Sequence, residues 1–201
     1  WPIDAGRLTE YLVKSAREAD LRTSWTGVNE PYESALGRLA AALTAPSERA
    51  GPLGLDGILA PTLRPGWANA LSSLVLRLTA PGVPDLYQGT AAFTYSLVDP
   101  DNRIEPNWDA RRSLVDVAGR LDGPAAWLGD DAEASKAVVI TRVLSLRQRV
   151  PDAFGERAGY LPLGVSGEHA DRVVAFARPD GERALVVTIV ATRSIGVESW
   201  E

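Results

Sequence analysis

The sequence predicts an α/β protein in two parts: a mostly helical segment over residues 1–155 and a small antiparallel β module over residues 156–201. Three observations support this prediction. Apolar residues recur at helical spacing along most of the first part. A short apolar stretch bounded by proline and glycine, residues 83–89, has the length of one buried strand of a parallel sheet. Two Val-rich stretches, residues 171–178 and 183–191, are typical of paired strands.

Five helices are expected in the helical segment. Asp4 and Asn29 have the side chains of N-caps, and the proline after Asn29 is tolerated in a first turn. Residues 46–57 are rich in glycine and proline and are expected to be irregular or short-helical. Pro151 ends the last helix. The apolar stripes place the five helices at residues 4–19, 29–43, 67–78, 109–121 and 134–149.

The two strands of the β module are joined by a turn sequence with a clear physical basis. In Pro179-Asp180-Gly181-Glu182, proline fixes its own φ and glycine takes the position that needs a positive φ. An antiparallel hairpin is therefore expected in this part of the chain.

Composition excludes several kinds of site. Cysteine is absent, so no disulfide, thiolate nucleophile or thiolate metal ligand is expected. The single histidine, His169, is expected at the surface or in a turn, so no catalytic triad or multi-histidine metal site is predicted. No cofactor is predicted. A net charge of -5 argues against nucleic-acid binding, and no apolar run is long enough to span a membrane. Because methionine is absent and the chain begins at Trp1, it is expected to be a piece of a longer protein.

The stretch from Pro81 to Arg103 carries the most chemistry. Tyr87 and Gln88 close the predicted strand, and the carboxyl ends of parallel strands are where ligands bind in α/β folds. The loop that follows brings aromatic rings together with charged and amide groups, the mixture that a carbohydrate site needs. The alternative is that the sequence Asp-Pro-Asp-Asn forms only a turn, with Arg103 pairing one carboxylate. The polar candidates in this loop are Asp99, Asp101, Asn102 and Arg103.

These residues also resemble a known family. PGVPDLYQGT followed by SLVDPDNR resembles the maltooligosyltrehalose synthases, members of the α-amylase superfamily of (β/α)8-barrel enzymes, glycoside hydrolase family 13. The first string is similar to that superfamily's motif at the last barrel strand, Gly-x-Pro-x-x-Tyr-x-Gly-x-Glu. The chain departs from this motif at Ala91, where the superfamily commonly has Glu. The matching positions are Gly82, Pro84, Tyr87 and Gly89.

Two further stretches narrow the resemblance to the synthase family. LRTSWTGVNEPY, residues 21–32, is similar to a family segment, and SGEHADRVVAFAR, residues 166–178, is similar to the start of the family's C-terminal β module. The resemblance implies that residues 1–155 contain helices and the last strand and helix of a (β/α)8 barrel. It further implies that residues 156–201 form the C-terminal module.

The family converts the reducing-end α-1,4 linkage of a maltooligosaccharide into an α,α-1,1 linkage, in trehalose biosynthesis. The superfamily's three catalytic carboxylates cannot be placed in this chain and are expected before Trp1, so the segment alone is expected to be inactive. Two alternatives remain: part of an amylase-type glucan hydrolase, or a non-catalytic carbohydrate-binding module. The substrate-binding residues implied by the motifs are Tyr87, Gln88, Asp99, Asp101, Asn102 and Arg103.

The resemblance also implies partners and a location. A maltooligosaccharide or glycogen-like α-1,4-glucan is the expected substrate, the rest of the polypeptide is the expected structural partner, and a trehalose-releasing hydrolase would use the product. No nucleic acid or membrane partner is expected, and the location is expected to be cytoplasmic. Outside the motif at residues 81–103, we expect Trp25 to be a buried anchor, Asn29 a helix cap and Trp67 a core residue.

Overall fold

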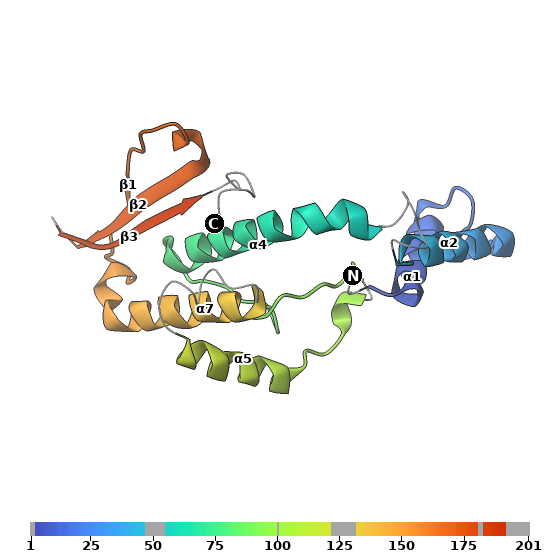
Figure 1. The fold of residues 1–201 in the computed structure, drawn as a ribbon, viewed down its shortest axis with the longest axis horizontal. Coiled ribbons are helices and arrows are strands. Elements are labelled where there is room, and N and C mark those ends of the chain that lie inside the picture. The colour runs from blue at the N-terminus through green and yellow to red at the C-terminus, as the bar shows by residue number, and fades with distance from the viewer. Residues whose placement is uncertain (1–2, 47–54, 100, 122–131, 181–182, 192–201) are drawn as a thin grey trace. The chain divides into compact units, whose positions relative to one another are not determined.

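The computed structural model describes residues 3–46, 55–99, 101–121, 132–180 and 183–191. The chain divides into two compact units, each built from two stretches of sequence. The first unit holds residues 1–63 and 94–105, and the second holds residues 64–93 and 106–201. Figure 1 shows the elements in chain order, helices first and the small sheet last. Within the described residues, no helix combines the length and apolarity needed to cross a membrane.

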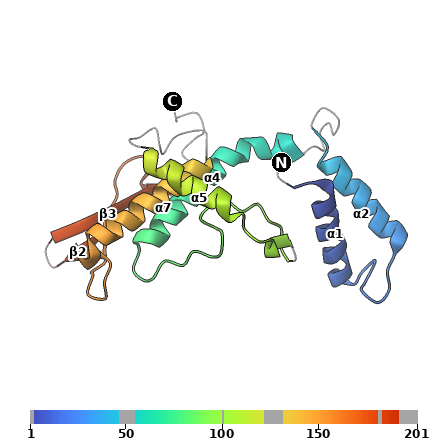
Figure 2. The same ribbon diagram turned by 90° about the horizontal axis from the view of Figure 1, so that it is seen from below.

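Two antiparallel helices of the first unit, α1 (Ala5–Ala19) and α2 (Glu30–Leu43), lie side by side (Figure 2). Both begin at the predicted caps. The Asp4 side chain accepts a hydrogen bond from the backbone N–H of Arg7 at 2.9 Å, and the Asn29 side chain accepts one from Tyr32 at 3.2 Å. These bonds satisfy backbone donors that a helix start leaves without partners. The predictions for both helices and for Asn29 as a cap are confirmed.

The third helix, α4 (Leu55–Thr79), begins earlier than predicted and continues from the first unit into the second. It includes Pro61 and Pro65, although proline removes a backbone donor from a helix interior. Pro61 and the three residues after it are exposed, so water can reach the Pro61 carbonyl, which lacks the donor that a residue other than proline at position 65 would supply. Trp67 is only partly buried and belongs to neither of the two core clusters, so its expected place in the core is wrong.

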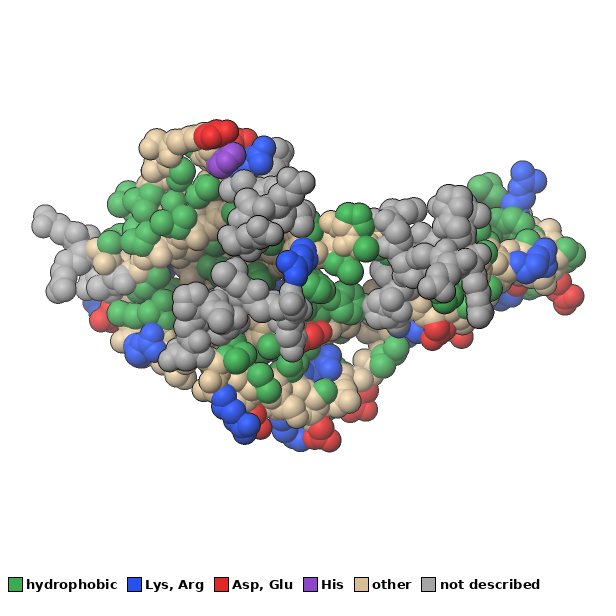
Figure 3. All heavy atoms as spheres, viewed as in Figure 1, with side chains coloured by type: hydrophobic (Ala, Val, Ile, Leu, Met, Phe, Trp, Pro, Cys, Tyr) green, Lys and Arg blue, Asp and Glu red, His purple; other side chains and the backbone are tan. Residues whose placement is uncertain are grey.

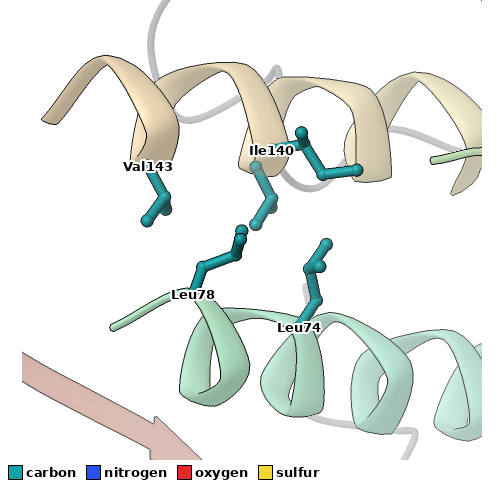
Figure 4. Packing of buried hydrophobic residues seen from close by; sticks show 5 residues of the cluster. Leu74, Leu78, Ile140 and Val143 are labelled. Carbon is teal, nitrogen blue, oxygen red and sulfur yellow. The ribbon is translucent and has the colours of Figure 1, made fainter. Parts of the chain in front are cut away.

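The core of the second unit forms where α4 packs on α7 (Ala132–Arg149). Figure 4 shows leucine side chains of α4 pointing toward isoleucine and valine side chains of α7. A smaller cluster joins α7 to α5 (Trp108–Arg120), which begins at the N-cap Asn107. Both helices match their predicted positions, and α7 ends before Pro151 as expected. The main cluster consists of Leu74, Leu78, Val139, Ile140 and Val143.

The β module is a three-stranded antiparallel sheet in the order β1-β2-β3, formed by β1 (Leu161–Pro162), β2 (Val173–Asp180) and β3 (Arg183–Ala191). The two predicted strands are present and pair as a hairpin. Strand β2 runs two residues further than predicted, to Asp180, and its register with β3 shifts after Arg178. The predicted turn residues Gly181 and Glu182 lie outside the described residues.

A buried arginine joins the sheet to the end of α7. The Arg178 Nε donates to the backbone carbonyl of Ala153 at 2.9 Å, in the short 3-10 turn η3 (Pro151–Ala153). Burial and the nearby Arg147 guanidinium lower the pKa of Arg178. The contact crosses the predicted boundary between residues 155 and 156, so the module is anchored to the turn η3 that follows α7.

The predicted parallel strand at residues 83–89 is not a strand in this structure. Residues 83–87 have no regular secondary structure and lead into a turn at residues 88–90, and Val83 is 95% exposed. A strand inside a sheet needs neighbours that accept and donate its backbone hydrogen bonds. The one sheet within the described residues is the antiparallel β module, so residues 83–89 have no strand to pair with there.

Candidate functional site

The loop that carries four of the six predicted site residues is fixed to α1 by an arginine. The Arg7 Nε and Nη2 donate to the two carboxylate oxygens of Asp101, each at 2.7 Å. Nη2 also donates to the backbone carbonyl of Tyr95 at 3.0 Å, and the Asp101 carboxylate accepts from the backbone N–H of Leu97 at 2.6 Å. The hydrogen bonds from Arg7 hold the pKa of Asp101 below its usual range, so this carboxylate stays charged at neutral pH.

A second cation from α1 holds the same loop. The Lys14 Nζ donates to the backbone carbonyl of Asp99 at 2.5 Å and lies 3.7 Å from its carboxylate. The other carboxylate oxygen of Asp99 forms an ion pair with Arg103 Nε. The short 3-10 turn η2 (Asp101–Arg103) follows, with Asn102 and Arg103 exposed. Pairing of Arg103 with a carboxylate is what the alternative turn interpretation predicted.

The other two predicted site residues belong to the second unit. Tyr87 and Gln88 are exposed at the start of a turn in which the Tyr87 carbonyl accepts hydrogen bonds from the backbone N–H and hydroxyl of Thr90, at 3.0 and 2.7 Å. Gly89 is buried there with a positive φ of 77°. Arg111 Nε donates to its carbonyl at 3.1 Å. The first unit thus brings Asp99, Asp101, Asn102 and Arg103 together, and the second unit holds Tyr87 and Gln88.

The chain after this turn is held by the start of α7. The backbone N–H of Phe93 donates to Glu133 at 2.8 Å, and Lys136 Nζ donates to the carbonyl of Ala92 at 2.9 Å. Lys136 also lies over the Phe93 ring, 4.6 Å from its centroid, and burial lowers the pKa of its ammonium group. Sequence reasoning missed Glu133 and Lys136 because they lie 40 and 44 residues from their partners.

In the family-like segment at residues 21–32, the structure differs from the prediction for Trp25. Trp25 is 60% exposed, so its expected role as a buried anchor is wrong within this chain. Its ring lies 5.1 Å from the Arg17 guanidinium, which binds both carboxylate oxygens of Glu33 at 2.8 and 2.6 Å. The Thr23 hydroxyl donates to the same carboxylate at 2.5 Å. The hydrogen bonds from Arg17 and then Thr23 lower the pKa of Glu33 from 4.5 to about 2.

This shifted pKa gives a pH dependence with a definite sign. Because the folded pKa of Glu33 is lowered from 4.5 to about 2, its contribution to stability is complete above pH 4.5 and is lost as the pH falls toward 2. Glu33→Gln is expected to lower the melting temperature at pH 6 more than at pH 3, as thermal unfolding followed by circular dichroism can measure. Glu30→Gln, on the same first turn of α2, is the matched control and should keep the wild-type pH response. An equal loss at both pH values for Glu33→Gln would contradict this explanation.

We searched the described residues for metal-ligand clusters and located the single histidine. No group of three or more His, Asp or Glu side chains there is arranged to hold a metal ion. His169 is exposed before the 3-10 turn η4 (Ala170–Arg172), and its purple side chain is visible at the surface in Figure 3. Its predicted place at the surface is confirmed. The exposed side chains of Asn102 and Arg103 offer hydrogen bonding and positive charge in the loop around Asp101.

No family model matches this chain. A putative maltooligosyl trehalose synthase from Mycobacterium tuberculosis (strain H37Rv) is 35% identical over 211 aligned positions, which cover 100% of this chain and 25% of that protein. A solved structure of maltooligosyltrehalose synthase from Arthrobacter ramosus is 33% identical with a TM-score of 0.77, covering 95% of this chain and 24% of that one. A Sulfolobus tokodaii hypothetical maltooligosyl trehalose synthase is 26% identical with a TM-score of 0.67, covering 94% and 24%.

The chain therefore spans about a quarter of the length of the proteins it matches. The agreement extends along nearly all of its residues in both sequence and fold, and it includes all three motif stretches. The resemblance drawn from those motifs is thereby confirmed: along its length, this chain is related to a quarter-length segment of the maltooligosyltrehalose synthases.

Proposed function

We propose that this chain is a segment of a longer maltooligosyltrehalose synthase. The observation that carries the proposal is the relation along the whole chain, at 35% and 33% identity, to proteins that bear this name. The three motif stretches at residues 21–32, 81–103 and 166–178 lie within this relation. The whole protein then acts in trehalose formation, on maltooligosaccharides or glycogen-like α-1,4-glucans.

The proposed reaction moves one glycosidic bond within a single glucan chain. The bond from C1 of the penultimate glucose to O4 of the reducing-end glucose breaks, and the same C1 then bonds O1 of that reducing-end glucose. No water is consumed and no sugar is released. Retaining chemistry of this kind needs two carboxylates about 5 Å apart. We place them in a part of the protein outside these 201 residues, so the chain by itself is expected to be inactive.

The six motif residues have distinct proposed roles at the glucan site: four contact the sugar and two hold the loop. Asn102 and Arg103 are exposed and face solvent with groups that can bond sugar hydroxyls. Tyr87 offers an exposed ring for a sugar face, and Gln88 a further amide. The Asp101 carboxylate is paired with Arg7 of α1 and the Asp99 carboxylate lies near Lys14 of α1, so these two residues hold the loop rather than contact the sugar.

The place of the segment in the whole protein follows from the same proposal. Residues 83–89 would form the last barrel strand once strands from the rest of the polypeptide pair with them. Residues 1–155 would belong to the barrel part and residues 156–201 to the C-terminal module. The protein would be cytoplasmic, and a trehalose-releasing hydrolase would act on its product.

The test is product analysis with the longer protein that contains this segment. Incubation with maltopentaose followed by chromatography should give a product that still has five glucose units but no reducing end. Glucose and maltotetraose as main products would support an amylase-type hydrolase instead. Binding of maltopentaose without any product would support a non-catalytic carbohydrate-binding protein.

A further inference from the structure

Two cations lie two turns apart on α1 and contact the same loop. Arg7 and Lys14 are seven residues apart, which places them on one face of the helix. The loop contains Asn102 and Arg103, to which the proposed function assigns contacts with the glucan. We propose that Arg7 is a positioning residue for glucan binding, which sets the conformation of residues 95–99 and 101–103 through Asp101. The inference rests on the proposed function.

The contact between Arg7 and Asp101 fixes an orientation as well as a distance. Two parallel N–H···O bonds of 2.7 Å join the guanidinium fork to both carboxylate oxygens. Such a bidentate pair restrains rotation of both groups, which a single point contact does not. The third donor, the backbone N–H of Leu97, ties the carboxylate to the opposite side of its own loop. Asp101 therefore joins the helix to both ends of a short loop.

The Asp101 carboxylate is not free to bind sugar. Three N–H donors occupy its two oxygens, and its side chain is only 12% exposed. The neighbouring Asn102 and Arg103 are exposed instead. Because Asp101 is held in place by these bonds, the two residues that follow it are held in an orientation that exposes their side chains.

Lys14 gives the loop a second point of attachment. It donates to the backbone carbonyl of Asp99, whose carboxylate pairs with Arg103. Arg7 also donates to the carbonyl of Tyr95. The attachments to α1 therefore span residues 95–101, the length of chain that leads up to Asn102 and Arg103.

The experiment measures kinetics of the longer protein with maltopentaose. Arg7→Met removes the bidentate pair while keeping the apolar stem, and it should raise KM by roughly tenfold, as expected when sugar hydrogen bonds from a displaced loop are lost, with a smaller change in kcat. Arg7→Lys retains the charge without the fork and should restore part of this loss. Hydrogen exchange at the backbone N–H of Leu97 should become faster in Arg7→Met, because its acceptor loses its support.

A matched control separates positioning from simple stability. Arg17→Met removes an equally bidentate ion pair from the same helix, but the guanidinium of Arg17 binds Glu33 of α2 instead of the loop at residues 95–103, so KM should stay unchanged. In an Asn102→Ala/Arg103→Ala background, Arg7→Met should cause little further rise in KM, because the groups it positions are gone.

The outcomes distinguish this inference from the proposed function. If the wild-type protein forms no trehalose-ended product, the proposed function fails and this inference fails with it. If the wild-type protein is active but Arg7→Met retains its KM, only this inference is overturned. It is also overturned if the rise in KM from Arg7→Met is equally large in the double-alanine background.

Discussion

Leu78→Ala is expected to lower the free energy of unfolding of the second unit by about 3 kcal/mol. Leu78 is fully buried between α4 and α7, where it packs against Ile140 and Val143 (Figure 4). Removing three carbon atoms from this position loses their transfer from water and leaves a cavity that rigid helices cannot close. The measurement is urea-induced unfolding followed by circular dichroism.

Leu144→Ala is the matched control for this prediction. Leu144 lies on α7 next to the core residue Val143, but it is 38% exposed. Its replacement removes the same atoms from a position already in contact with water and should cost less than about 1 kcal/mol. Equal losses for the two variants would mean that the α4–α7 contact does not form the core of this unit.

Gly89→Ala is expected to destabilise the second unit by about 3 kcal/mol. The backbone at Gly89 has a φ of 77°, which residues with a Cβ atom rarely adopt. A Cβ there would lie 2.5 Å from Pro106 Cγ and 2.7 Å from Pro106 Cβ, well inside contact distance. The strain and the overlap act together, because the buried turn and the Arg111 hydrogen bond to the Gly89 carbonyl leave little room to move.

Gly82→Ala separates the energetic cost of the positive φ from the cost of the overlap with Pro106. Gly82 also has a positive φ, of 108°, but the residue is exposed, and a Cβ added to it would meet no described atom within 4 Å. Only the backbone cost applies there, about 1 kcal/mol. Urea unfolding of both variants should therefore give the larger loss for Gly89→Ala. If the two losses are equal, the contact with Pro106 is unimportant, and the motif requires glycine at position 89 for its backbone alone.

Local signals predicted most of the helices and strands. The caps Asp4 and Asn29 and the apolar stripes located α1 and α2, because both signals act within a few residues. The prolines in α4 made its first turns hard to predict. Pro61 and the three residues after it are exposed, and a helix tolerates proline more readily at an exposed position than at a buried one. The prediction of a strand at residues 83–89 was wrong for a different reason. Strand formation depends on pairing partners, and the described residues offer none for this segment.

The candidate site could be predicted only in part for the same physical reason. The motif identified Asp101, Asn102 and Arg103, but nothing local indicates that the Asp101 carboxylate is occupied. Its partner Arg7 is 94 residues away in the sequence, and long-range ion pairs leave no periodic signal. Trp25 was expected to be buried as an anchor, yet its ring is exposed beside Arg17.

The most direct test of the central claim is whether the reaction is intramolecular. The longer protein containing this segment is incubated with unlabelled maltopentaose and an excess of ¹³C-labelled glucose, and the products are analysed by mass spectrometry. The proposed isomerase should form a trehalose-ended product of five glucose units without label, because the cleaved glucose is retained and rejoined through O1. Label in the trehalose-ended product would contradict the intramolecular reaction, and unlabelled free glucose with maltotetraose as the main products would contradict the proposal and indicate hydrolysis.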